Sequence, residues 1–129
     1  MNDGDDETHD RLEARLRSEG DRTEALIGDL RHELASIAES TAAGPDDEHD
    51  AEGSTVAYER ARVQALLAHA ERTAAEIAVA VERVSLAPSG ALVCERCGSV
   101  IPAERLVALP ATRICVACAT DMHRNDGRP

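Results

Sequence analysis

Aromatic residues are almost absent from this chain of 129 residues, which has no Trp, no Phe and a single Tyr. Aromatic side chains supply much of the apolar area that a globular core buries, and buried apolar area stabilises a fold by about 25 cal/mol per Å². Alanine makes up much of the 43% hydrophobic content and buries little area. The composition therefore excludes a thick globular core and favours a thin helical structure that is also held together by other means.

Lysine is absent too, so all 14 basic residues are Arg, while 25 acidic residues bring the formal net charge to −11. Proteins that bind duplex DNA gain most of their affinity by neutralising phosphates with basic side chains. We therefore expect no direct, sequence-specific DNA binding from an acidic chain with scattered arginines. A basic protein channel or a bound cation fits this charge better.

Long hydrophobic runs are also missing. No apolar stretch approaches the ~20 residues of a membrane span, and residues 1–10 are too polar and acidic for a signal peptide. We therefore expect a cytoplasmic protein without a membrane partner. In the cytoplasm, paired cysteines bind metal or do redox chemistry more often than they form structural disulfides.

Two segments, by contrast, repeat apolar residues in alternating steps of four and three, the pattern of a coiled-coil seam. Gly44-Pro45 stops the first helix, which begins near Glu7, and Ser54 or Thr55 offers an N-cap to the second. Each helix is about 50 Å long at ~1.5 Å per residue, and two seams joined by a short loop predict an antiparallel pair. The seam positions are Leu16, Thr23, Ile27, Leu30, Leu34, Ile37 and Thr41, then Val63, Leu67, Ala70, Ala74, Ile77, Val81 and Val84.

The four cysteines form two C-x₂-C pairs separated by 17 residues. Zinc prefers four soft ligands at tetrahedral corners, about 2.3 Å from each sulfur. A two-residue gap lets one tight turn present both thiolates, and Gly98 tolerates the left-handed backbone that such turns often use. With four protein ligands no coordination position is open for catalysis. The spacing predicts one structural Zn²⁺ held by Cys94, Cys97, Cys115 and Cys118.

Three other interpretations of the cysteines stay open. One C-x₂-C pair could be a redox dithiol, or the site could have lost its metal, and His123 could replace one cysteine as a ligand. The second pair lies where a short helix is expected, from Val116 to about His123. The sequence thus predicts a mostly α fold, which comprises a flexible N-terminus at 1–6, a long antiparallel coiled-coil hairpin at 7–88, and a small four-cysteine zinc finger with a short terminal helix at 89–129.

The loop predicted at 43–53 is strongly acidic. It could be a solvated turn whose acids favour the positive end of the following helix, by about 0.3–1 kcal/mol each. It could also be the working end of the hairpin, because carboxylates bind Mg²⁺ and pair with basic side chains. His49 beside them is expected to be an ordinary loop residue. The acids are Asp46, Asp47, Glu48, Asp50 and Glu52.

The cysteine module, with its interleaved Gly98, Ile101-Pro102, Arg105-Leu106, Ala108 and Pro110, resembles the zinc finger of the DksA/TraR family. The resemblance covers residues 94–118, and the preceding hairpin agrees in architecture. It implies a non-enzymatic transcription regulator that binds RNA polymerase and inserts the hairpin into the secondary channel, with tip acids near the active centre, to modulate initiation.

The family's tip pattern, D-x-x-D followed two residues later by alanine, places the tip role on Asp47 and Asp50. Glu52 stands where the alanine is expected, because Ala51 follows Asp50 directly.

Three hypotheses follow for function. The first is the polymerase-binding regulator, which we expect to be a monomer. The alternative is a zinc-stabilised coiled-coil adaptor that binds another protein and has no polymerase role. The third is a thiol oxidoreductase, which needs an exposed thiolate of low pKa. An enzyme of the hydrolase class has little support, because the sequence lacks a Ser-His-Asp pattern, an H-E-x-x-H motif and a glycine-rich phosphate loop.

Overall fold

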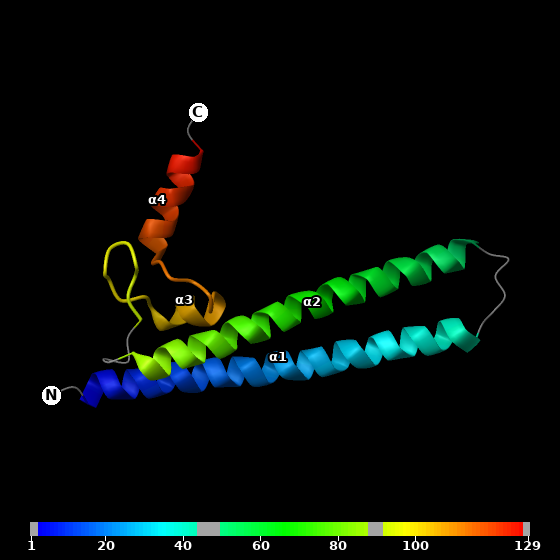
Figure 1. Cartoon of the computed structure of the whole chain (residues 1–129), viewed down its shortest axis with the longest axis horizontal. Coiled ribbons are helices and arrows are strands. Elements are labelled where there is room, and N and C mark those ends of the chain that lie inside the picture. The colour runs from blue at the N-terminus through cyan, green and yellow to red at the C-terminus, as the bar shows by residue number, and fades with distance from the viewer. Residues whose placement is uncertain (1–2, 44–49, 88–91, 128–129) are drawn as a thin grey trace. The chain divides into compact units, whose positions relative to one another are not determined.

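The computed structural model describes residues 3–43, 50–87 and 92–127. The chain is mostly α, as predicted, with two long helices that form a hairpin and two short helices near the C-terminus (Figure 1). Within the described residues there is no β-strand, only an isolated antiparallel bridge between Val93 and Val100. No helix in these ranges combines the length and apolar character that crossing a bilayer requires. The helices are α1 (Asp3–Ala43), α2 (Asp50–Leu86), α3 (Ala103–Ala108) and α4 (Val116–Asp126).

The two long helices begin earlier than the sequence predicted. α1 starts at Asp3 rather than Glu7, and α2 starts at Asp50, ahead of the Ser54 or Thr55 proposed as its N-cap. Acidic residues interact favourably with the partial positive charge of a helix N-terminus. The acid-rich sequence at both starts therefore favours extra helical turns.

The chain forms two compact units, and α1 and α2 contribute to both. We call residues 21–74 the hairpin unit, and residues 1–20 with 75–129 the finger unit. In the hairpin unit four side chains from the two helices form a buried cluster, and four more pack on it half-buried. All eight were predicted as seam positions, which confirms the antiparallel pairing here. They are Ile27, Leu30, Val63 and Ala70, with Leu34, Ile37, Leu67 and Ala74.

Polar contacts replace apolar packing at one predicted seam position of the hairpin unit. Thr41 is exposed, and its hydroxyl donates to the Ile37 carbonyl at 2.8 Å. The same hydroxyl accepts a hydrogen bond from Arg60 of α2 at 3.3 Å. The apolar seam thus ends before Thr41, and a side-chain contact joins the two helices there instead.

In the finger unit, one buried cluster combines both long helices with the C-terminal module. Leu12 and Leu16 of α1 and Ala80 and Val84 of α2 pack with four residues of that module, namely Leu92, Cys94, Ile101 and Leu106. The described part of the module therefore shares its core with the helices. Leu12 and Ala80 were not among the predicted seam positions.

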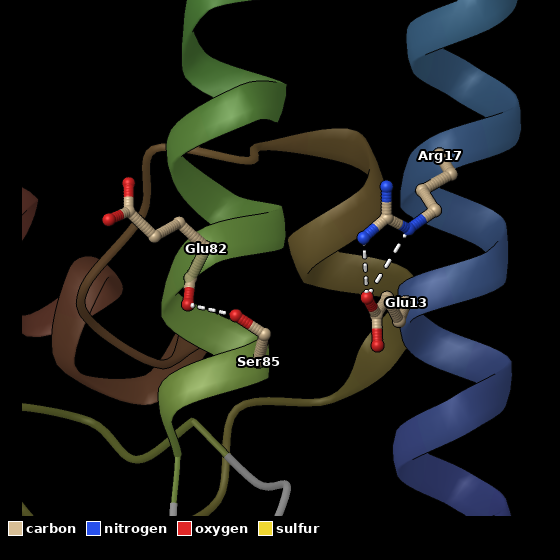
Figure 2. Close-up of polar contacts among 4 residues, drawn as sticks. All are labelled: Glu13, Arg17, Glu82 and Ser85. Carbon is tan, nitrogen blue, oxygen red and sulfur yellow. Dashed lines mark hydrogen bonds and ion pairs between the residues drawn. The ribbon is translucent and has the colours of Figure 1, made fainter.

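Local hydrogen bonds support the helices of this unit. Figure 2 shows Arg17 donating from Nε and Nη2 to Glu13 Oε1, one turn earlier in α1, at 3.2 and 2.7 Å. An exposed pair with this spacing stabilises a helix by about 0.2–0.5 kcal/mol. The Ser85 hydroxyl donates to the Glu82 carbonyl at 2.9 Å (Figure 2). That bond joins a side chain to the backbone three residues earlier, one turn from the end of α2.

Replacing Gly28 with alanine should stabilise the hairpin unit. Gly28 lies in α1, and a Cβ atom added there would meet nothing within 4 Å. Glycine inside a helix costs about 1 kcal/mol relative to alanine. We expect G28A to raise the free energy of unfolding by about 0.5–1 kcal/mol, measured by urea denaturation followed by circular dichroism. At Gly20 the added Cβ would lie 3.4 Å from Ile77 Cγ2, so G20A should gain no more than G28A. Destabilisation by G28A would contradict the open space seen at this position.

Candidate metal centre

A short hairpin positions the first cysteine pair. The amide of Ile101 donates to the Leu92 carbonyl at 2.8 Å, and the amide of Cys94 donates to the Ser99 carbonyl at 2.7 Å. Val93 and Val100, the residues between these two pairs, form the isolated antiparallel bridge. The backbone therefore reverses direction between Cys94 and Ser99, so that the intervening residues form a tight turn.

Gly98 provides the conformation that this turn needs. Its φ is +76°, the only positive φ among the described residues, and its amide donates to the Cys94 carbonyl at 2.9 Å. A residue with a Cβ pays about 1–2 kcal/mol in this region. The glycine predicted to follow the first pair is thus required by the backbone.

The start of α4 positions the second pair. Cys115 is the N-cap residue, with φ −76° and ψ 169°, and Cys118 lies in the first turn, where the Ala119 amide already bonds the Cys115 carbonyl at 3.0 Å. The predicted helix start at Val116 is confirmed, and the helix continues to Asp126, beyond the expected His123. The N-cap and the first turn of one helix thus present both cysteines of the second pair.

The distances between the four sulfur atoms fit a zinc site. All four Sγ atoms lie within 4.8 Å of one another, and the Cys97 and Cys115 sulfurs are 3.7 Å apart. A tetrahedron with zinc–sulfur bonds of 2.3 Å has an edge of about 3.8 Å. A disulfide would need about 2.05 Å, and all four cysteines are free. The spacing of the sulfurs thus fits a metal site and excludes a disulfide.

The electrostatics of the cluster also favour a cation. Burial opposes a charge on Cys94, but hydrogen bonds from the backbone amides of Cys115, Cys97 and Arg96 lower the pKa of Cys94 to about 6. Hydrogen bonding within the sulfur cluster, with Cys115 first, and then burial raise the pKa of Cys118 to about 12. Ionisation of Cys94 is thus favoured at neutral pH, while the neighbouring sulfurs disfavour ionisation of Cys118. A divalent cation would let Cys118 ionise as well, because its positive charge stabilises all the thiolates at once.

The site is a structural one. Cys94 is buried at 2% exposure within the core of the finger unit, Cys115 and Cys118 are half-buried, and Cys97 is exposed. Four cysteine ligands fill the tetrahedral shell and leave no position for a substrate. The four cysteines therefore bind one structural zinc ion. His123 is exposed on α4 and is not part of the cluster, so the ligand set consists of sulfur alone.

The structure describes only part of the two predicted tip residues, Asp47 and Asp50. Asp47 lies outside the described residues. Asp50 is the first residue of α2, and its side chain lies outside the description. Their role stays a prediction from the sequence.

A family model matches the residues around the metal site. Residues 88–122 match the model described as "Prokaryotic dksA/traR C4-type zinc finger". This range includes all four cysteines, α3 and the first turns of α4. The match agrees with the resemblance predicted from the spacing of the cysteines and the residues between them.

Two individual proteins resemble longer parts of the chain. An uncharacterized protein of Aquifex aeolicus (strain VF5) is 44% identical over 55 residues, which cover 43% of this chain and 37% of that protein. The match thus spans little more than a third of the length of that relative. The solved structure of transcription factor DksA2 from Pseudomonas aeruginosa superposes with a TM-score of 0.74 at 20% identity. It covers 99% of this chain and 90% of the DksA2 chain. The fold is therefore shared over nearly the whole length.

Proposed function

Because its cysteine module is a zinc finger of the DksA/TraR family and its fold is that of DksA2, we propose that the chain is a non-enzymatic transcription regulator that binds RNA polymerase. It inserts the tip of the helical hairpin into the secondary channel and modulates transcription initiation. The observation that carries this proposal is the combination of the four-sulfur site with an antiparallel helix pair in one DksA-like fold.

The charge of the segment that joins the two helices supports the same function. The sequence between Ala43 and Thr55 contains five acidic residues and no basic one. A polymerase active centre handles nucleotides and Mg²⁺, so carboxylates there can affect the metal or the basic side chains that surround it. Asp47 and Asp50, which match the family's D-x-x-D pattern, are the residues proposed to act.

Neutralising these two acids tests the proposal. D47N with D50N should leave binding to purified bacterial RNA polymerase within about threefold, because a zinc-stabilised base and the helix surfaces supply most of the contact area. The same variant should reduce the effect on open-complex lifetime and transcript yield by about tenfold, since a carboxylate that pairs with a cation contributes about 1.5–3 kcal/mol. Binding is measured by co-purification and transcription by a promoter assay.

A matched control comes from acids on the hairpin surface. D21N with D29N removes the same charge from two exposed positions of α1 and should behave like the unmodified protein in both assays. Failure to co-purify with the polymerase, or a tip variant with unaltered binding and unaltered transcription, would count against the proposal. If substitutions in the hairpin seam abolish binding to another protein while the tip has no effect, the adaptor function is correct instead.

A further inference from the structure

Two arginines from different helices bind the segment that leads into Cys115. Arg83 of α2 donates from Nη1 to the Thr112 carbonyl at 3.1 Å. Arg105 of α3 donates from Nε to the Ile114 carbonyl at 2.9 Å. These contacts connect residues that are 29 and 9 positions apart in the sequence. The backbone next to the second cysteine pair is therefore held from α2 and from α3.

The Arg113 carbonyl, which lies between the Thr112 and Ile114 carbonyls in the sequence, is bound by the turn that carries the first cysteine pair. The amide of Glu95 donates to the Arg113 carbonyl at 2.9 Å. The Thr112 hydroxyl adds a bond of 3.1 Å to the Ile114 carbonyl. Three consecutive carbonyls thus accept hydrogen bonds from three separate parts of the finger unit. Contacts from outside the segment, together with the local Thr112 bond, therefore fix its position.

The two arginines are half-buried, which distinguishes them from arginines on the surface. Burial lowers the pKa of Arg83, and the nearby charge of Arg113 acts in the same direction. A guanidinium group that loses water needs acceptors fixed in place, because a buried donor without a partner is costly. The Arg113 side chain, by contrast, forms an ion pair with Glu95 at 3.1 Å in which both side chains are more than half exposed.

We propose that Arg83 and Arg105 are positioning residues for the zinc site. By fixing the backbone directly before Cys115, they place the second cysteine pair where its sulfurs meet those of the first pair. Neither arginine belongs to the cluster of four sulfur ligands. Groups that orient metal ligands in this way typically change metal affinity by 10–100-fold when they are removed.

Zinc affinity of the full chain, measured by competition with a chromophoric chelator, tests this role. R105M keeps the apolar stem but removes the donor, and it should raise the zinc Kd by about 10–100-fold. R83M should raise it by about tenfold. R105K should recover part of the loss, because an ammonium group can donate to the Ile114 carbonyl without the fixed geometry of a guanidinium.

A spectroscopic readout separates positioning from general stability. When Co²⁺ replaces Zn²⁺, each variant at saturation should show the same tetrahedral thiolate bands as the unmodified protein, while the concentration for half-saturation shifts. The helical content of the zinc-free variants should equal that of the zinc-free unmodified protein. An equal loss of helix with and without metal would show a merely structural role and overturn the proposal.

R113M is the matched control, because it removes a positive charge from the same segment, where the Arg113 side chain forms an exposed ion pair with Glu95. It should change the Kd by at most about threefold. If R113M weakens zinc binding as much as R105M, the general charge near the thiolates is responsible and the proposal is wrong. Unchanged affinity in both R83M and R105M would overturn it as well. If R105M does not fold, R83M and R105K decide the question.

Discussion

Replacing Cys97 with serine should abolish stoichiometric zinc binding and unfold the C-terminal module, while α1 and α2 stay helical in the hairpin unit. A serine hydroxyl does not ionise near neutral pH and is a poor zinc ligand. The binding free energy of a structural zinc ion, about 10–16 kcal/mol in small zinc peptides, is available only to the folded module. Zinc content and far-UV circular dichroism measure the two effects.

The size of the helix loss separates the two units. α3 and α4 contain 6 and 11 residues, against 41 and 37 in α1 and α2, so C97S should lose at least about a sixth of the helical signal. More is expected as the helix ends that pack on Leu92 and Ile101 lose their cover and fray. A117S, which adds a hydroxyl at an exposed position between Cys115 and Cys118, should retain zinc. Complete loss of helix in C97S would show that the hairpin unit depends on the metal.

Replacing Leu16 with alanine should have the second largest effect, and it should reach the metal site. The Leu16 side chain is fully buried among residues of α1, α2 and the cysteine module, including Cys94. Leu-to-Ala substitutions in such cores cost about 2–5 kcal/mol, because packing is lost and a cavity remains. We expect L16A to lower the stability of the finger unit by about 3 kcal/mol. Because the cluster includes a zinc ligand, zinc should be released at a lower urea concentration.

The readout for L16A is zinc release to a chelator across a urea titration, compared with the helical signal. L26A on the same helix is the control, since Leu26 is 49% exposed and its truncation should cost less than about 1 kcal/mol. Zinc release at the same urea concentration in L16A and in the unmodified protein would contradict a shared core between the helices and the metal module.

The features predicted correctly from the sequence are those that repeat or have a fixed spacing. The four-three pattern located the buried positions Ile27, Leu30 and Val63 because a helix face repeats at a constant interval. The C-x₂-C spacing located the four sulfurs that lie within 4.8 Å of one another, because coordination geometry limits how far apart paired cysteines can lie. Both signals are local in the sequence, so no knowledge of tertiary structure was needed.

The features that were missed depend on contacts between distant residues. α3 has only six residues, with Leu106 as its buried side chain, too few for a periodic signal. The bridge between Val93 and Val100 consists of one residue pair. Leu12 and Ala80 are buried because the cysteine module covers them, and the bond from Arg83 to Thr112 spans 29 positions. Sequence patterns alone do not show which distant segments meet.

Each unit buries its own apolar cluster, so the length of the helix pair and the chemistry of the metal site can change independently. Seven residues inserted into or deleted from each helix at matching levels would preserve the four-three pattern and alter the hairpin by about 10 Å. Such a change would leave every residue of the cysteine module as it is. Relatives with the same sulfur ligands can therefore differ in hairpin length by whole heptads.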